Sequence, residues 1–375
     1  MTPEKTGPNP LSPIAFFIPG LNGGGAQRVF VTLVNTLVKM TSRPIHLVTV
    51  REGGVFESLV DERVVRVVLG QQRVLHSILP LARYLRAERP AAVVSTLDYC
   101  NIAFLSATFF CRAPFRKVIR EANVIPEQVN SPRAKIKSAG LMFLMRLLYR
   151  RADAVIIITK DVETSLLRHR VARLERMRRI PNPVILKGAA PKGSNSVGPP
   201  GERFIVAVGR LSYQKGFDVL IGAFAQLADQ DLRLVILGEG PLEARLRELA
   251  AENHVADRVS FPGFVPDTRE YLRMASLFVL PSRWEGFSNV LAEALAAGTP
   301  IVASDCPGSP REVLEGGRLG RLVPVGDPDV LAEAIAAELE QPSATPEARI
   351  QRASAFEAEK IADQYLQLLT AGYTQ

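Results

Sequence analysis

Short runs of apolar residues alternate with longer segments of helical periodicity along the chain. The first apolar run predicts a strand over residues 14–20, and after a group of glycines the apolar spacing from Val29 to Val38 predicts a helix. Similar strand-like runs lie at residues 44–50, 91–96, 117–121 and 154–159. Continuous apolar strands are typical of sheets buried on both faces, so this alternation predicts a parallel sheet covered by helices.

A segment rich in Pro, Gly and Ser interrupts the alternation at residues 179–202 and predicts a linker. The pattern then resumes, with strands predicted over residues 204–209, 232–240, 259–265, 276–282 and 299–304. The tail at residues 347–370 predicts one or two helices with no strand after them. The chain therefore reads as two α/β units of similar size.

Composition narrows the class of protein. With 47% apolar and 22% charged residues, the 375-residue chain has an ordinary globular balance, and no apolar run is long enough to span a bilayer. Cys100, Cys111 and Cys306 lack the spacing of a disulfide framework or a zinc site, which predicts that the protein is located in a reducing cytoplasm. The four histidines are scattered, so we expect no metal site.

Charge is distributed unevenly. Residues 1–180 hold 28 Lys and Arg against 13 Asp and Glu, whereas the rest of the chain has a net charge of −7. This predicts an anionic partner for the first half, such as a nucleic acid, a membrane surface or a phosphorylated substrate; a merely solvated surface is the alternative. Aromatic residues are not interleaved with the basic ones, which argues against nucleic acid.

One basic segment, residues 133–151, mixes six cations with seven apolar side chains of Leu, Met and Phe and holds no acidic residue. It predicts an amphipathic helix that lies on an anionic membrane. The alternative is an ordinary helix that covers the sheet.

Two cations follow the first strand of the second unit. Gly209 ends this strand, and Arg210 and Lys215 lie in the turn before the next helix. Backbone amides at the carboxyl end of a parallel strand favour an anion, and two cations beside them suit a diphosphate. Gly238 ends the next strand, so a second turn whose backbone is conformationally free is expected at the same carboxyl edge of the sheet. Two solvated surface cations are the alternative.

The segment 280–300 carries two carboxylates. Ser288 is a candidate N-cap of an apolar helix that contains Glu293 and is closed by Gly298. A buried Glu293 needs hydrogen-bond donors, either the hydroxyls of a bound sugar or an internal partner. Glu285 precedes Glu293 by eight residues, and Gly286-Phe287 lets backbone N–H groups approach an anion.

These motifs together resemble the family 4 retaining glycosyltransferases. The resemblance covers residues 14–340 and rests on the Glu285–Glu293 spacing and on VGRLSYQKG, VILGEGP, FPGFV and RIPNPV. It implies the α/β fold named GT-B, in which two doubly wound, Rossmann-like domains face each other across a cleft. The acceptor-side domain would be residues 1–183 completed by a helix at 355–375, and the nucleotide-sugar-binding domain would be residues 184–354.

The family also implies roles for the residues. Arg210, Lys215 and Glu285 would be catalytic, with the two cations on the donor diphosphate and Glu285 at the transferred sugar. Glu293 would bind the ribose, and Phe264 and Val265 the base. The remaining donor contacts would come from glycine turns and helix amides: Gly24, Gly25, Gly209, Gly238, Gly286, Phe287 and Ser288.

Arg120, Glu121 and Asn123 stand where family members that add N-acetylhexosamines often carry Arg/Glu-x-Asn, which implies an acceptor-side position. The implied reaction moves an N-acetylhexosamine or hexose from a UDP-linked donor to a hydroxyl of a membrane-associated glycan, without a metal or other cofactor. We expect this peripheral enzyme at the cytoplasmic face of the inner membrane. A sugar-nucleotide epimerase or phosphorylase on the same scaffold, and a catalytically silent binding subunit, are the alternatives.

Overall fold

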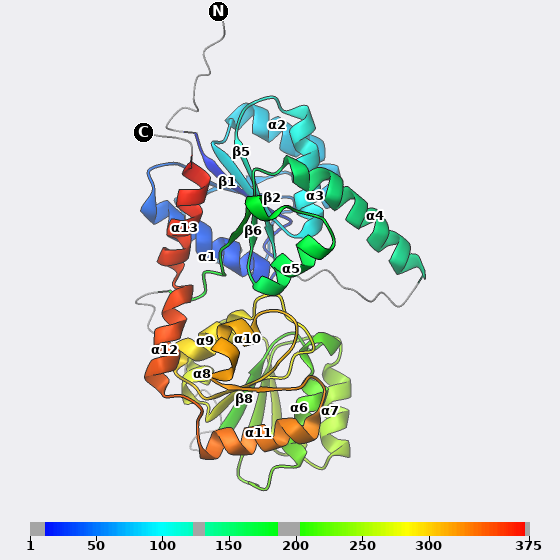
Figure 1. Ribbon diagram of the computed structural model, residues 1–375, viewed down its shortest axis with the longest axis vertical. Helices are drawn as coiled ribbons and strands as arrows, with labels where there is room; N and C mark the ends of the chain where they lie inside the picture. The colour runs from blue at the N-terminus through cyan, green and yellow to red at the C-terminus, as the bar shows by residue number, and fades with distance from the viewer. Residues whose placement is uncertain (1–11, 123–131, 187–202, 372–375) are drawn as a thin grey trace, which may run out of the picture. The chain divides into compact units, whose positions relative to one another are not determined.

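The computed structural model describes residues 12–122, 132–186 and 203–371, and the chain forms two compact units (Figure 1). Unit 1 comprises Met1–Val184 together with Ala358–Gln375, and unit 2 comprises Ile185–Glu357. The predicted boundaries, after residues 183 and 354, lie one and three residues before those of the structure. Each unit carries a parallel sheet flanked by helices, which confirms the predicted α/β class.

The sheet of unit 1 has seven parallel strands in the order β3-β2-β1-β4-β5-β6-β7. Strands are added on one side of β1 and then on the other, so the order reverses between β1 and β4. Open α/β sheets bind ligands at such a switch point, outside the carboxyl ends of the strands. The strands are β1 (Ile14–Ile18), β2 (Ile45–Thr49), β3 (Val65–Val68), β4 (Ala92–Thr96), β5 (Arg116–Glu121), β6 (Ala154–Ile157) and β7 (Met177–Arg179).

Helices from both ends of the chain complete unit 1. The C-terminal helix α13 packs against α1 and buries Ile361 and Tyr365 in the same core as Phe16 and Phe30. Its apolar residues recur at helical spacing, so one face enters the core while the other stays polar. The helices are α1 (Gly25–Met40), α2 (Ile78–Glu88), α3 (Asp98–Ala107), α4 (Pro132–Leu148), α5 (Lys160–Arg168) and α13 (Ala358–Thr370).

Unit 2 repeats this arrangement with six parallel strands in the order β10-β9-β8-β11-β12-β13. Its order reverses between β8 and β11, and its core is formed by the apolar residues of these strands with α6, α7 and α11. The strands are β8 (Phe204–Val208), β9 (Arg233–Leu237), β10 (Val259–Gly263), β11 (Leu277–Leu280), β12 (Ile301–Ser304) and β13 (Arg321–Val323). The helices are α6 (Phe217–Ala225), α7 (Glu243–Glu252), α8 (Arg269–Met274), α9 (Asn289–Ala297), α10 (Pro310–Val313), α11 (Pro328–Glu340) and α12 (Pro346–Ala353).

A buried ion pair fastens α12 to α11. The Arg349 guanidinium lies 2.9 Å from a carboxylate oxygen of Glu338, and both side chains are at most 1% exposed. Arg349 also donates to the backbone oxygen of Leu319 at 3.0 Å, and Ser343 donates to Glu338. These additional hydrogen bonds offset the desolvation of the two charges. Because α12 packs on α9, the pair supports the helix that carries Glu293.

Candidate active site

Glycine turns meet at the switch point of the unit 2 sheet. Gly238 follows β9 with φ +133°, and a Cβ placed there would lie 2.0 Å from the backbone oxygen of Gly209, which follows β8. Gly216, before α6, approaches the backbone of Pro281 after β11 equally closely. Only glycine allows backbones to approach this closely, so the turns at this carboxyl edge form one packed surface.

Lys215 and Glu285 meet on this surface although 70 residues separate them in the chain. The Lys215 Nζ lies 2.6 Å from Glu285 Oε1, and the side chains are 17% and 6% exposed. Ser282 donates to the same carboxylate oxygen at 2.6 Å. The Lys215 stem runs along Gly209, where a side chain would collide with it. The structure thus joins two predicted site residues from the turns after β8 and β11.

The N-terminus of α9 lies beside this pair. Ser288 occupies the N-cap position as predicted, but its hydroxyl makes no capping bond, and its backbone N–H donates to Ser309 Oγ at 2.9 Å. The buried Ser288 Oγ has no hydrogen-bond partner within the described part of the chain. A helix N-terminus attracts an anion through its dipole and through N–H groups that have no acceptor within the helix. Gly298 ends the helix in the left-handed conformation, as predicted.

Glu293 is buried on α9, and its carboxylate accepts a hydrogen bond from another residue of unit 2. Its side chain accepts a hydrogen bond of 2.9 Å from the hydroxyl of Thr268, a residue that is itself buried. Arg269, the next residue, pairs with Asp267 and also interacts electrostatically with Glu293. The internal partner considered from the sequence is therefore present, and it includes the hydroxyl of Thr268.

Other predicted donor-side residues are more exposed. Phe264 and Val265 follow the edge strand β10, and the Phe264 ring is 52% exposed. Arg210 is exposed in the turn after β8. Cys306, after β12, is buried near Glu285, and burial raises the pKa of its thiol to about 12, so it is no nucleophile at neutral pH.

Two exposed aromatic residues border the Lys215–Glu285 pair, and our sequence reasoning missed them. Tyr213 and Trp284 are 62% and 46% exposed, with ring centroids 6.2 Å apart. Arg283 stacks on the Tyr213 ring and donates to Asp218 from both terminal guanidinium nitrogens, at 2.9 and 2.7 Å. Trp284 directly precedes Glu285 and Tyr213 lies two residues before Lys215, so closeness in sequence was the available signal.

In unit 1 the corresponding edge carries the glycines after β1. Gly24 has φ +120° and precedes α1, which begins at Gly25. On the other side of the switch point, Leu97 follows β4 with φ +75°, a strained conformation for a branched residue. Nothing in the sequence signals the strain at Leu97.

Arg120 and Glu121, predicted to face the acceptor, are buried at the end of β5. Arg120 donates to Thr96 Oγ1 at 2.9 Å and to Asn182, and burial lowers the pKa of its guanidinium. Glu121 accepts from Asn101 Nδ2 at 2.8 Å and from the Tyr149 hydroxyl.

Burial raises the pKa of Glu121 to about 7. The side chains of Arg120 and Glu121 thus form hydrogen bonds within unit 1 and hold together the segments at the carboxyl end of β5. Asn123 lies outside the described residues.

The described ranges offer neither a metal centre nor a membrane span. No group of three or more His, Cys, Asp or Glu side chains in these ranges could hold a metal ion. No helix among the described residues is both long and apolar enough to cross a membrane.

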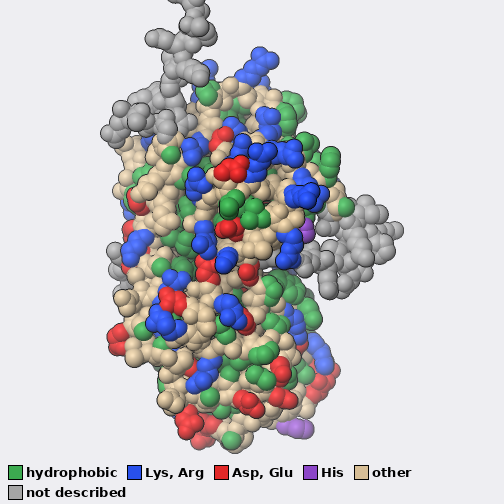
Figure 2. All heavy atoms as spheres, in the orientation of Figure 1, with side chains coloured by type: hydrophobic (Ala, Val, Ile, Leu, Met, Phe, Trp, Pro, Cys, Tyr) green, Lys and Arg blue, Asp and Glu red, His purple; other side chains and the backbone are tan. Residues whose placement is uncertain are grey.

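On the face shown in Figure 2, Lys and Arg side chains gather over unit 1.

Comparison with known proteins identifies the family. Residues 23–187 match the family model Glycosyltransferase Family 4, and residues 194–356 match the model Glycosyl transferases group 1. The chain is a glycosyltransferase. Sequence and fold agree, since the two matched segments correspond to the two α/β units.

Named relatives support this identification. This glycosyltransferase is 28% identical over 373 residues to the N-acetylgalactosamine-N,N'-diacetylbacillosaminyl-diphospho-undecaprenol 4-alpha-N-acetylgalactosaminyltransferase of Campylobacter jejuni, covering 96% of this chain and 100% of the relative. It is 32% identical to a lipopolysaccharide core biosynthesis mannosyltransferase of Rhizobium leguminosarum, over 52% of this chain and 57% of the relative.

Solved structures share the fold of the whole chain. HepE of Anabaena, in complex with UDP and glucose, matches with a TM-score of 0.79 at 21% identity, over 96% of this chain and all of HepE. A sucrose-phosphate synthase of Thermosynechococcus elongatus matches with a TM-score of 0.76 at 22% identity, over 95% and 98%. The predicted GT-B fold and the predicted transferase activity are confirmed.

Proposed function

We propose that the glycosyltransferase moves a sugar, an N-acetylhexosamine or hexose, from a UDP-linked donor to a hydroxyl of a lipid-linked glycan, with retention of the anomeric configuration. The observation that carries the donor site is the convergence of Lys215, Glu285 and the α9 N-terminus at the unit 2 switch point. The HepE complex holds UDP, and the Campylobacter relative is named for a diphospho-undecaprenol substrate, which supports this donor and acceptor chemistry.

The geometry favours stabilisation of a diphosphate leaving group. Lys215 is held in place by its carboxylate partner, Arg210 extends from the same turn, and the unused Ser288 hydroxyl and the α9 amides add hydrogen-bond donors. Preorganised donors of this kind act where negative charge develops in the transition state. The leaving oxygen would itself take the proton of the acceptor hydroxyl on the same face of the sugar, which is the route to retention. With two cations at the diphosphate, the reaction would need no divalent metal.

The donor site is tested by measuring release of nucleoside diphosphate from a panel of nucleotide sugars. We expect Lys215→Ala and Arg210→Ala to fold and to lose turnover on the order of 10²–10³-fold, the usual effect of removing one electrostatic donor. Arg203→Ala is the matched control, because Arg203 pairs with Asp229 where β8 begins, at the opposite edge of the sheet. Wild-type turnover in both test variants would refute the donor assignment.

The acceptor side of the proposal rests on α4. Its residues Met145 and Leu148 are buried against unit 1, whereas Phe143, Leu144 and Leu147 are 65%, 42% and 54% exposed. The predicted cations Arg133, Lys135 and Lys137 lie on the same helix, although their side chains are outside the described residues. Exposed apolar side chains beside cations are typical of helices that lie on an anionic membrane. We therefore infer that α4 docks the enzyme at the membrane that holds its acceptor.

Flotation with phosphatidylglycerol vesicles tests this docking. Phe143→Ser/Leu147→Ser should reduce the bound fraction several-fold, since each buried CH₂ contributes about 0.8 kcal/mol. Leu75→Ser/Leu79→Ser is the matched control, because these two residues are 63% and 52% exposed near α2. Equal flotation of both variants and wild type would show that α4 is an ordinary packing helix.

A further inference from the structure

A pocket of about 430 Å³ opens on unit 1 beside the strands β6 and β7. Its walls come from the turn after α4 (Tyr149–Arg151), the end of α5 with the loop after it, and the turn Leu174–Arg176 that leads into β7. These segments lie where strands begin, at the edge of the sheet opposite the carboxyl ends that carry Gly24 and Glu121. The pocket therefore does not belong to the site described above, and its volume falls within the range of small-molecule sites.

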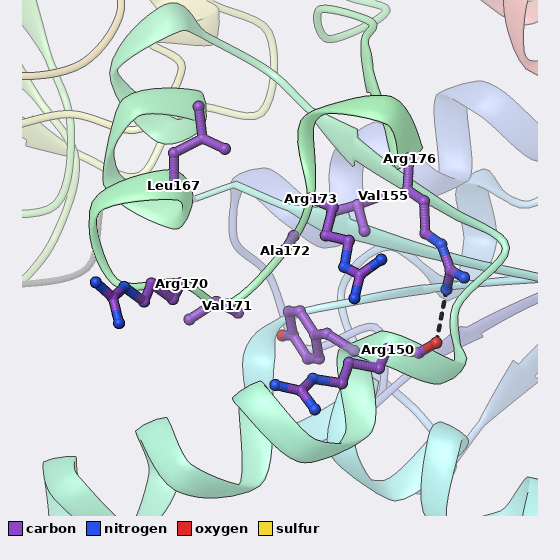
Figure 3. A pocket seen from close by; sticks show the side chains of 9 residues that line it. Arg150, Val155, Leu167, Arg170, Val171, Ala172, Arg173 and Arg176 are labelled. Atoms are coloured by element: carbon purple, nitrogen blue, oxygen red, sulfur yellow. Dashed lines mark hydrogen bonds between the residues drawn. The ribbon is translucent and has the colours of Figure 1, made fainter.

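Arginine dominates the lining. Arg150, Arg170, Arg173 and Arg176 are four of the nine lining residues, and none of the nine is acidic. Figure 3 shows the side chains of Arg150 and Arg173 extending into the same space and Arg170 pointing outward from the loop after α5. Glu175, a neighbour in the chain, lies 3.7 Å from Arg173 with both side chains about 70% exposed, so it screens Arg173 little.

The framework under these arginines is well bonded. Arg176 Nη1 donates to the backbone oxygens of Arg150 at 2.6 Å and of Ala152 at 2.9 Å, which fixes the turn that carries Arg150. Tyr149 forms a buried wall, and its hydroxyl is anchored to Glu121 and Asn101 in the core. The turn that carries Arg150 is thus fixed beside an apolar wall that includes Val155 and Val171.

The chemistry of this lining selects for phosphate. A guanidinium fork binds phosphate oxygens through two parallel hydrogen bonds, and two forks beside one space suit a group with three exposed oxygens better than a single carboxylate. The apolar wall and the volume leave room for a small organic substituent. We propose that this pocket binds the phosphate group of a small organophosphate, at a site separate from the sugar-donor site of unit 2.

Calorimetric titration with glycerol 3-phosphate tests the pocket directly. Arg150→Gln/Arg173→Gln removes the two inward-facing cations and leaves Arg176 in its structural role. We expect its affinity to fall on the order of 10²-fold, about tenfold for each arginine whose charge-assisted hydrogen bonds are removed. The matched control is Arg73→Gln/Arg83→Gln, which removes two exposed cations of unit 1 outside the pocket and should bind like wild type.

Vesicles distinguish the two sources of such a phosphate. If the double variant also loses binding to phosphatidylglycerol vesicles, and glycerol 3-phosphate releases the wild type from them, the phosphate is that of a lipid headgroup. If only titration in solution changes, the ligand is a soluble organophosphate. The proposal is overturned if the double variant binds glycerol 3-phosphate and vesicles as tightly as the control, or if the wild type binds neither. Nucleoside diphosphate release depends on unit 2 and would fail independently of this result.

Discussion

The buried carboxyl group of Glu121 makes the stability of this glycosyltransferase depend on pH. It lies at the end of β5 and accepts hydrogen bonds from Asn101 and Tyr149, yet its desolvation outweighs these contacts and raises its pKa from 4.5 to about 7. Replacing Glu121 with Gln keeps the shape of the side chain and one acceptor oxygen but removes the titration. The substitution therefore isolates the electrostatic contribution of this one group.

The direction in which the free energy of unfolding changes with pH follows from proton linkage. Between pH 4.5 and 7 the folded protein keeps the Glu121 proton while the unfolded chain has released it, so the free energy of unfolding falls as pH rises. The rise in pKa from 4.5 to about 7 corresponds to roughly 3 kcal/mol of stability, which is present in full below about pH 4.5 and lost by about pH 7 to 8. In the Gln variant this loss is absent, so the variant gains about 3 kcal/mol relative to wild type across the same window.

Urea unfolding followed by circular dichroism at pH 4.5, 5.5, 6.5 and 7.5 measures this difference. Only the difference between the two proteins is used, because other groups titrate equally in both. Glu163→Gln is the control, because it makes the same chemical change at a half-buried position in the first turn of α5. A difference for Glu121→Gln that is flat over this range would refute the account of a carboxyl group destabilised by burial.

Two further predictions concern carboxylates of unit 2. Glu293→Gln should weaken nucleotide-sugar binding on the order of 10–100-fold, measured by calorimetry. Its melting temperature should change little, because the Gln side chain still accepts a hydrogen bond from Thr268. A variant that unfolds more easily but binds the donor with unchanged affinity would show that Glu293 is a structural residue. Glu338→Gln should cost about 3–5 kcal/mol in urea unfolding, because Arg349 would remain buried without its anion. The exposed change Glu333→Gln on the same helix should have almost no effect, and equal stability of the two variants would contradict the importance of the pair.

The central strands could be predicted from sequence because they are buried on both faces. β1, β4 and β8 coincide with continuous apolar runs, whereas we predicted no strand at β3, β7 or β13, each of which contains arginine. These three strands are only three or four residues long and lie at the edges of their sheets. Three of the four residues of β3 are exposed. An edge strand forms by pairing with its neighbour, so its own residues need not be apolar.

Those features of the candidate site that depend on a few adjacent residues could be predicted from the sequence. Glycine turns, the helix that ends at Gly298 and the burial of Glu293 each follow from a few adjacent residues. Pairings across the sheet were not predictable, because the contact of Thr268 with Glu293 depends on which strands become neighbours. The burial of Arg120 and Glu121 was missed for a similar reason: their partners come from four other segments of unit 1, and no local pattern indicates them.

The Lys215–Glu285 pair is better explained by function than by stability. Both groups are largely withdrawn from water, and a buried ion pair contributes little net stability because desolvation offsets most of the attraction. The glycines around it leave backbone amides and a lysine stem where side chains would otherwise pack. A fold selected for stability alone would fill this space with apolar residues, as it does in the core below β8. The buried Ser288 hydroxyl beside this pair has no hydrogen-bond partner among the described residues, and in the function that we propose the diphosphate of the donor would accept a hydrogen bond from it.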